Sequence, residues 1–420
     1  MSSCPRCGVE IRADRRFTTW CAACDWNVDP QQSDAEKKRG LERVRRRLAR
    51  RYGERLFAEL SGVDGRRPRG GRTASGLLAY TIALAVHGVT VALAAGGVWF
   101  VVNGWGGIGM VPGLLLTALA WSLRPRLNRL PRNAHVLLRN DAPELYALID
   151  EVARAVGARG VDVVIVDDEP NASVTQLGVR RRLLTLGLPL WEVLTPQERI
   201  ALLGHEFGHF TLGDTRHGMV VGSAYNSLVT WHYYVEPAED SQVVEVIANV
   251  LYFLPRWLIA GVVMLLDLLT SQASQRSEYL ADSAAAHTGS TQAAVGLMDR
   301  LLVTNSVVTA LHRETNSRRM RGGVRVSAQD ADGLWEALAA HMASIPESEY
   351  ERQRRAGALR GHSVDASHPP THLRRRLLLA RTPVPASVTA DADRADRIVA
   401  ELADVRTALA RDVVRDGYGY

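Results

Sequence analysis

Two short motifs contain the residues of this 420-residue chain that are best suited to catalysis. The first is His205-Glu206-Phe207-Gly208-His209, and the second is Glu278-Tyr279-Leu280-Ala281-Asp282. Residues four apart on a helix share a face, so His205 and His209 can offer two imidazole nitrogens to one metal ion. Glu206 would then stand beside a water molecule at that metal. This arrangement is typical of zinc peptidases, in which the glutamate is the general base.

The residues around the first motif predict a helix over 196–210. Thr195 can cap it, Pro196 suits its first turn, and apolar residues recur along one face. A catalytic zinc takes three protein ligands and keeps one position open, so a third ligand must come from elsewhere. The longer pattern HExxHxxGxxH is excluded, because Leu212 and Thr215 stand where it requires Gly and His. The third ligand is therefore distant in the sequence.

The second motif offers two candidates for that role. Glu278 and Asp282 are four apart in an alanine-rich stretch that favours helix, so both carboxylates face the same way. One can bind the metal while the other accepts the free ring N–H of a ligating histidine, which fixes the tautomer of that histidine. Asp282 could do this for His205 or for His209. Taken alone, the pair could also be an ordinary solvated acidic face.

A different third ligand would imply a different enzyme. Asp267 lies in the apolar run 264–268, and as a ligand it would make the protein an intramembrane protease. We favour this less, because the zinc helix itself carries Gln197, Glu198 and Arg199 and is no membrane span.

The motifs together resemble the membrane-bound zinc metallopeptidases of the HtpX and CAAX prenyl protease type. The resemblance spans roughly residues 135–380 and includes, in the family's order, Pro170-Asn171-Ala172, HEFGH, Ser277 to Asp282, and His368-Pro369-Pro370-Thr371 followed by Arg374. It implies a gluzincin endopeptidase with zinc ligands His205, His209 and Glu278 and with Glu206 as the base. It also implies that Asn171 and Ala172 lie near the substrate. The segment 368–376 offers donors for the reaction's oxyanion in His368, His372 and Arg374.

All four cysteines lie in the first 24 residues, as two CxxC pairs formed by Cys4, Cys7, Cys21 and Cys24. Paired CxxC turns are typical of a structural zinc with four thiolate ligands. Disulfides are the alternative, and they fit poorly in a compartment that keeps thiols reduced. We therefore predict a zinc ribbon over residues 1–30 and two zinc ions in all, one structural and one catalytic.

Residues 31–72 are rich in Lys and Arg and account for much of the net charge of +6. A basic segment just before an apolar run typically lies against anionic lipid head groups. We therefore expect a juxtamembrane helix and linker that bind lipid, and we do not expect a nucleic acid as the partner.

A membrane hairpin is predicted over residues 73–124. The runs 76–102 and 108–123 are almost free of ionisable side chains. Arginines flank the hairpin on both ends, and the loop between its two runs is uncharged, so both ends should face the cytoplasm. The extension before it is too long and polar for a cleaved signal peptide. We expect a protein of the plasma membrane whose zinc ribbon and catalytic site face the cytoplasm.

Two further apolar segments, 218–235 and 243–270, lie between His209 and Glu278. Both halves of one metal site must lie on one side of the membrane, so the chain crosses there twice or not at all. The acidic connection favours crossing, whereas Arg256 near the middle of the second segment opposes it, at a cost of about 2.5–3.5 kcal/mol. Two or four spans remain open from the residues, and the resemblance favours four.

The expected architecture is mainly α: a multi-pass membrane gluzincin with a zinc-site helix, a small β-sheet and an N-terminal zinc ribbon. The peptidase domain covers 135–380, and an amphipathic helix is expected within 381–420. The expected function is hydrolysis of peptide bonds in membrane or misfolded proteins on the cytoplasmic side. The alternative is a non-catalytic membrane scaffold that recruits partners through its ribbon.

Overall fold

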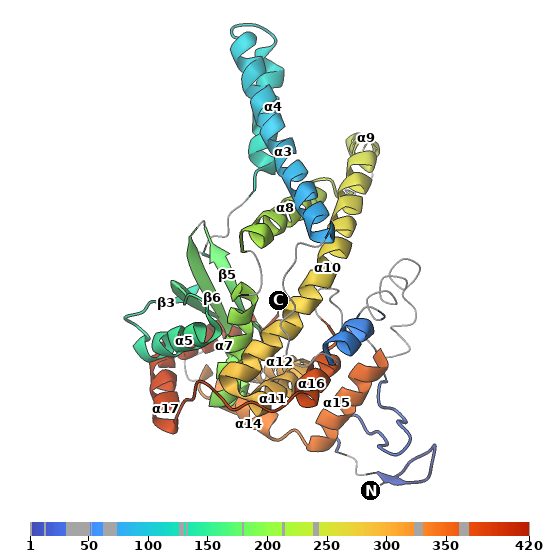
Figure 1. Cartoon of the computed structure of the whole chain (residues 1–420), viewed down its shortest axis with the longest axis vertical. Helices are drawn as coiled ribbons and strands as arrows, with labels where there is room; N and C mark the ends of the chain where they lie inside the picture. Colours follow the sequence, from blue (N-terminus) through green and yellow to red (C-terminus); the bar gives the residue numbers. More distant parts are fainter. Residues whose placement is uncertain are drawn as a thin grey trace. The chain divides into compact units, whose positions relative to one another are not determined.

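The computed structural model describes residues 2–11, 14–30, 51, 53–61, 74–125, 130–131, 133–178, 180–211, 215–237, 243–322, 331–360 and 369–419. Most of the predicted basic segment 31–72, and the predicted oxyanion donor His368, lie outside these residues. The chain divides into two compact units (Figure 1). The first contains residues 1–66, 129–212 and 275–420, and the second contains 67–128 and 213–274. Helix α10, Phe253–Gly289, belongs to both.

A four-stranded sheet in the first unit positions the predicted catalytic helix. Its strands are β3 (His135–Leu137), β4 (Val163–Asp167), β5 (Ala172–Leu177) and β6 (Arg181–Gly187), in the order β3-β4-β6-β5. Strands β4 and β6 run parallel, and the two outer pairs are antiparallel. Strand β5 is therefore an edge of the sheet, and the helix that carries the first motif packs beside it (Figure 1).

Helices pack against this sheet and share one hydrophobic core with it (Figure 1). Val163, Ile165, Leu177 and Leu183 of its strands form a separate, smaller cluster. The fold is mainly helical, as predicted. The helices of the first unit, besides the second half of α10, are α5 (Pro143–Val156), α6 (Leu188–Val193), α7 (Pro196–Thr211), α11 (Thr291–Leu302), α12 (Thr304–Gly322), α14 (Leu334–Ala343), α15 (Glu347–Arg360), α16 (Thr371–Ala380), α17 (Ala392–Glu401) and α18 (Ala403–Asp416).

The C-terminal segment differs from its prediction. We expected one amphipathic helix within 381–420, and the structure has two, α17 and α18, which meet at Leu402. The apolar positions Ile398, Leu402, Val405 and Leu409 are all buried in the core. A break at Leu402 allows each short helix to pack its own apolar face against the core. The predicted apolar face is therefore buried, but it belongs to two helices and not to one.

The second unit consists of apolar helices. They are α3 (Ala74–Asn103), α4 (Met110–Leu123), α8 (Thr215–Tyr234), α9 (Val243–Leu251) and the first half of α10. Helices α3 and α4 pack closely at Gly113, where an added Cβ would lie 2.7 Å from the backbone nitrogen of Val101. The hairpin thus has its two helices at the predicted place, with a turn at 104–109.

Two helices of the described residues are long and apolar enough to cross a membrane: Ser75–Asn103 and Phe253–Gly289. Helix α4 is a shorter apolar helix. The bent pair of helices α11 and α12 is also long and apolar enough to count as a third candidate span. However, its apolar side chains, such as Leu297 and Leu311, belong to the hydrophobic core of the first unit.

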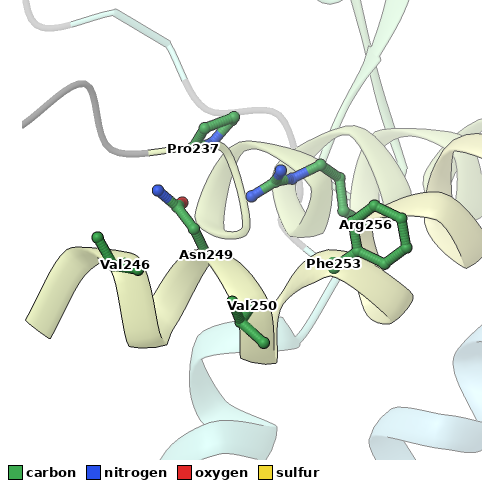
Figure 2. A pocket seen from close by; sticks show the side chains of 6 residues that line it. All are labelled: Pro237, Val246, Asn249, Val250, Phe253 and Arg256. Carbon is green, nitrogen blue, oxygen red and sulfur yellow. The ribbon is translucent and has the colours of Figure 1, made fainter. Parts of the chain in front are cut away.

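Arg256 is the charged residue that opposed a membrane position for its segment. Its Nε donates a hydrogen bond of 2.7 Å to the carbonyl oxygen of Val235, just beyond the last residue of α8. The side chain also lines a cavity of about 510 Å³ whose other walls are Pro237, Val246, Asn249, Val250 and Phe253 (Figure 2). A helix C-terminus attracts positive charge, so this contact lowers the cost of an arginine in an apolar segment.

Candidate active site and cysteine cluster

Helix α7 begins where the sequence predicted, because Thr195 and Glu198 form a reciprocal cap. The backbone N–H of Glu198 donates to Thr195 Oγ1 at 3.3 Å, and the N–H of Thr195 donates to Glu198 Oε2 at 2.8 Å. The face bearing Ile200, Leu203 and Phe207 is fully buried. With its start and its buried face both set, the helix presents His205 and His209 one turn apart on the adjoining face.

Two glycines of α7 allow helix α10 to approach closely. A Cβ added to Gly208 would lie 2.9 Å from the Cα of Ala281, and one added to Gly204 would lie within bonding distance of the side chain of Thr288. A larger residue at Gly208 would have to move the backbone of α10, and one at Gly204 would have to displace the side chain of Thr288. The small faces of the two helices therefore meet, and this contact brings Glu278 to the histidines across 69 residues of sequence.

Three metal-binding atoms meet between these helices. Nε2 of His205 lies 3.3 Å from Nε2 of His209 and 3.5 Å from Oε2 of Glu278, and Nε2 of His209 lies 3.5 Å from Oε1 of the same carboxylate. Zinc bonds to nitrogen and oxygen of about 2.0–2.2 Å give a tetrahedral site with ligand atoms about 3.3–3.6 Å apart. One ligand atom from each of the three side chains lies within 4.8 Å of the other two, so the group can hold one metal ion, and the residue that completes it is Glu278, not Asp267.

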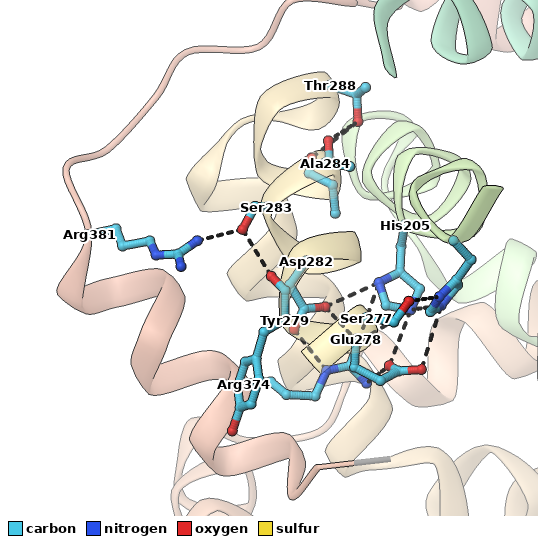
Figure 3. Close-up of polar contacts among 12 residues, drawn as sticks. His205, Ser277, Glu278, Tyr279, Asp282, Ser283, Ala284, Thr288, Arg374 and Arg381 are labelled. Carbon is cyan, nitrogen blue, oxygen red and sulfur yellow. Dashed lines mark hydrogen bonds and ion pairs between the residues drawn. The ribbon is translucent and has the colours of Figure 1, made fainter. Parts of the chain in front are cut away.

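Asp282 lies behind His205 in this arrangement (Figure 3). Its Oδ1 is 3.1 Å from Nδ1 of His205, whereas Nδ1 of His209 faces the hydroxyl of Ser277 at 3.3 Å. The sequence had left open which histidine Asp282 would contact. A proton held on Nδ1 of His205 by the carboxylate leaves Nε2 free of hydrogen and aimed at the other two donors.

Arg374 of α16 joins the two acids (Figure 3). It donates from Nε to Asp282 Oδ2 at 2.8 Å and from Nη2 to Asp282 Oδ1 at 2.6 Å, and its Nη1 lies 3.2 Å from Glu278 Oε2. All three side chains are buried. The sequence offered Arg374 as an oxyanion donor, but the structure places its guanidinium among the carboxylates behind the metal donors.

The electrostatic environment suits metal binding. Burial, followed by the neighbouring His205, lowers the pKa of His209 to about 4, so its imidazole is neutral at pH 7. Burial acts to raise the pKa of Asp282, but the Arg374 guanidinium and His205 outweigh it and hold that pKa far below its ordinary value. The site therefore presents a neutral imidazole ligand and an ionised carboxylate that orients the other imidazole.

Glu206 has the properties of a general base. Burial raises its pKa to about 7, assisted by the charge of Glu278 and opposed by His205 and by a hydrogen bond from the backbone N–H of Val174. The side chain is only partly buried, unlike His205 beside it. A carboxylate with a pKa near neutrality can both accept and return a proton.

Strand β5 is the part of the site that the sequence reading missed. Asn171 and Ala172 were predicted only to lie near the substrate, and the structure adds that Ala172 begins β5, the edge strand whose Val174 contacts Glu206. The signal was present in the alternation of Ala172 and Val174, which are buried, with Ser173 and Thr175, which are partly exposed. Polar residues and a preceding Pro-Asn pair obscured it.

The cysteines form a second group of metal-binding atoms in the first unit. Cys4 Sγ lies 3.7 Å from Cys24 Sγ, and Cys7 Sγ lies 3.5 Å from Cys21 Sγ. A disulfide would bring the sulfurs to about 2.0 Å, whereas a tetrahedral zinc–thiolate site holds them about 3.8 Å apart. The four sulfurs lie within 4.8 Å of one another, so their spacing fits a zinc ion and not disulfides.

Comparison with known proteins identifies similarity over the region that contains the histidine and glutamate motifs. The sequence model of peptidase family M48 matches residues 139–382. A Protease HtpX homolog of Methanocaldococcus jannaschii is 25% identical over 154 residues, which are 34% of this chain and 54% of that protein. Protease HtpX homolog 1 of Sulfurisphaera tokodaii is 32% identical over 94 residues, which are 22% of this chain and 30% of that protein.

A third relative, a Protease HtpX homolog of Thermococcus kodakarensis, is 27% identical over 103 residues, 24% of this chain and 36% of that protein. The chain thus spans about half or less of the length of these curated relatives. No solved structure matches it. The two CxxC pairs precede the region that the family model covers.

Proposed function

Because the chain belongs to peptidase family M48 and is thus a metallopeptidase, we propose that it is a membrane-anchored zinc endopeptidase with His205, His209 and Glu278 as metal ligands. The observation that carries this proposal is the position of Glu206, a carboxylate of pKa about 7 adjoining the three donors and held by the edge strand. A purely structural metal site has no use for a base there.

The chain's own residues divide the work of peptide hydrolysis. A zinc ion at this site would polarise the substrate carbonyl and acidify water. Glu206 accepts the proton of the attacking water and returns it to the amine nitrogen that leaves. Asp282 holds the proton of His205 on Nδ1, and Arg374 holds Asp282 in turn. Asp282 and Arg374 are therefore positioning residues in this proposal.

The edge strand β5 supplies a place for an extended substrate. All six residues of β5 pair with β6, but hydrogen bonds alternate along an antiparallel pair, and Asn171 accepts one from the backbone N–H of Gly187 at 2.8 Å. The alternate residues, Ala172 and Val174, direct their backbone groups to the opposite edge, where Val174 meets Glu206. A peptide that added itself to this edge would pass the base and the metal donors.

The apolar unit supports anchoring in a membrane. Large apolar side chains are widely exposed on it, including Val91, Val102, Leu115, Trp257 and Leu258 at 61–66% of their surface. Such a surface suits lipid and is rare on a soluble monomer. We infer a multi-pass protein of the plasma membrane, with the arginine-rich flanks of the 73–124 hairpin and the catalytic site on the cytoplasmic side.

The remaining parts follow from this placement. The basic segment 31–72 would bind anionic lipid head groups, the peptidase domain would cover 135–380, and the cysteines would hold a second, structural zinc. Segments 218–235 and 243–270 would be embedded with the hairpin. The substrates would be membrane or misfolded proteins whose extended segments can reach β5.

One experiment separates the peptidase from a non-catalytic scaffold. Wild-type protein and Glu206→Gln are purified in detergent, zinc is counted, and cleavage of an unfolded protein is measured with and without chelator. We expect two zinc ions in both proteins and chelator-sensitive cleavage by the wild type alone. Equal cleavage by both proteins would refute the role of Glu206, and a single zinc held by the cysteines would favour the scaffold.

A further inference from the structure

The four cysteines lie in a small N-terminal module, residues 1–30, which we call the cysteine module. It contains two equivalent turns. In each, the residue after the second cysteine donates its backbone N–H to the first cysteine's carbonyl: Gly8 to Cys4 and Asp25 to Cys21, both at 2.9 Å. Both donors have left-handed backbones, with φ of +76° and +56°. The hydrophobic cluster of the module consists mainly of its own cysteines with Ile11 and Trp26. Such a small core requires a metal to stay folded.

Helix α15 of the peptidase region binds this module through its arginines. Arg355 donates from Nη1 to the carbonyl of Ala22 at 2.6 Å and to Asp25 Oδ1 at 2.8 Å. Arg352, which is 6% exposed, donates to the carbonyl of Val28 at 2.7 Å. The contact to Ala22 depends on the folded backbone of the module, because Ala22 lies within the second cysteine turn.

Apolar contacts reinforce the same surface. Trp20 and Val28 of the module form a buried cluster with Ala356 of α15, and Val28 is 1% exposed. The guanidinium of Arg355 lies 5.2 Å from the centre of the Trp20 ring. Charged, hydrogen-bonded and apolar contacts thus join the module to α15, and Arg16 of the module also donates to the hydroxyl of Ser344, directly after α14, at 2.9 Å.

Ion pairs continue from α15 to the helix that carries Arg374. Arg354 of α15 makes two hydrogen bonds to Asp299, of 2.9 and 2.8 Å, and Arg375 of α16 forms an ion pair with the same carboxylate at 2.8 Å. Asp299 thereby links α15 to α16. Arg375 directly follows Arg374, whose guanidinium holds Asp282 beside His205.

We propose that the N-terminal cysteine module is an intramolecular clasp: with zinc bound to its four thiolates it docks on α15 and keeps α15 and α16 in the position that the catalytic site requires. The predicted zinc ribbon thus binds to α15 of its own chain and not to another molecule. When the thiolate metal is lost, the module unfolds, Arg352 and Arg355 lose their acceptors on it, and α15 is released on that face. The docking stands on contacts alone, whereas its effect on cleavage rests on the proposed function.

The test compares the full-length protein with three variants in detergent. Cys21→Ser/Cys24→Ser removes the thiolate site, Arg355→Ala removes docking contacts while keeping all cysteines, and Arg415→Ala is a control. Arg415 is also a surface arginine with acidic partners, Asp412 and Asp416, but they lie on its own helix. Zinc content, amide hydrogen exchange of α15 and cleavage rate are measured for each.

We expect the cysteine variant to retain one zinc per chain and to exchange the amides of α15 about tenfold faster, which corresponds to about 1.4 kcal/mol of lost protection. Arg355→Ala should retain two zinc ions and show the same change in smaller degree, and Arg415→Ala should behave as the wild type. Cleavage should fall in parallel with α15 protection.

Two outcomes would overturn the clasp. In the first, exchange of α15 is unchanged in the cysteine variant although its structural zinc is gone, so the module does not hold the helix. In the second, α15 loosens but cleavage keeps its wild-type rate, so the helix does not support the site. If the wild type cleaves nothing, the proposed function fails, and hydrogen exchange still decides the docking.

Discussion

Arg374 donates two parallel hydrogen bonds to the carboxylate of Asp282, of 2.8 and 2.6 Å. Oδ1, which accepts the shorter bond, lies 3.1 Å from Nδ1 of His205. An ion pair in a buried place is retained only where both partners stay satisfied. Here the carboxylate has two tasks, because it neutralises the arginine and orients the imidazole.

Asp282→Asn should weaken the catalytic zinc without removing it. An amide of similar size cannot offer the same charge to the ring N–H of His205, and loss of such a partner typically lowers metal affinity about 10–100-fold. Competition with a graded series of chelators, monitored by zinc release, measures this. The zinc of the cysteine module serves as the internal reference, and its affinity should stay unchanged. An equal loss at both sites would indicate general unfolding instead.

Arg374→Ala should destabilise the peptidase unit by about 3–5 kcal/mol, because it leaves the carboxylates of Asp282 and Glu278 buried without their cation. Arg374→Lys should recover only part of this, since an ammonium cannot make the paired contact to Asp282. Thermal unfolding followed by circular dichroism compares the two variants with the wild type. Full stability of the lysine variant would show that charge alone suffices and that the paired geometry is unimportant.

Gly208→Ala should separate the two helices that form the metal site. The new Cβ would meet the Cα of Ala281 at 2.9 Å, and backbone atoms cannot turn aside as a side chain can. We expect a loss of about 1–3 kcal/mol in stability, together with weaker zinc binding. Gly222→Ala in α8 is the matched control, because nothing lies within 4 Å of its Cβ and alanine favours helix.

Glu206 should make the metal-free protein less stable as the pH rises. Its folded pKa of about 7 lies above the ordinary value of 4.5, so folding favours the protonated form. This contribution to stability is complete below the ordinary pKa and is lost as the pH rises through 7. In the presence of a chelator, the melting temperature of Glu206→Gln relative to that of the wild type should therefore increase from pH 5 to pH 8.5. A constant difference across that range would contradict the raised pKa.

Cysteine labelling can test the proposed topology. Trp105, in the turn between α3 and α4, is 75% exposed, and Leu379 of α16 is 55% exposed. An impermeant maleimide added to intact cells should label Trp105→Cys and should label Leu379→Cys only after lysis. The four native cysteines should likewise be labelled only after lysis. The reverse pattern would place the catalytic site outside the cell.

The sequence by itself predicted the chemistry and determined the helices that carry its candidate residues. HEFGH after a capped helix start predicted α7, and the uncharged run before Asn103 predicted α3, because local periodicity and composition decide such elements. The CxxC pairs likewise predicted a four-sulfur group. In each case the residues that act together are near neighbours in the sequence, or the signal is a property of one continuous segment.

Only the tertiary structure decided which distant residues meet. It brought Glu278 and not Asp267 to the histidines, gave Asp282 to His205 and not to His209, and placed Arg374 behind the carboxylates. It also made 172–177 an edge strand and docked the cysteine module on α15. These outcomes depend on close packing between elements, at Gly208 and Ala281 for example, and packing across long sequence separations leaves no periodic signal in the chain.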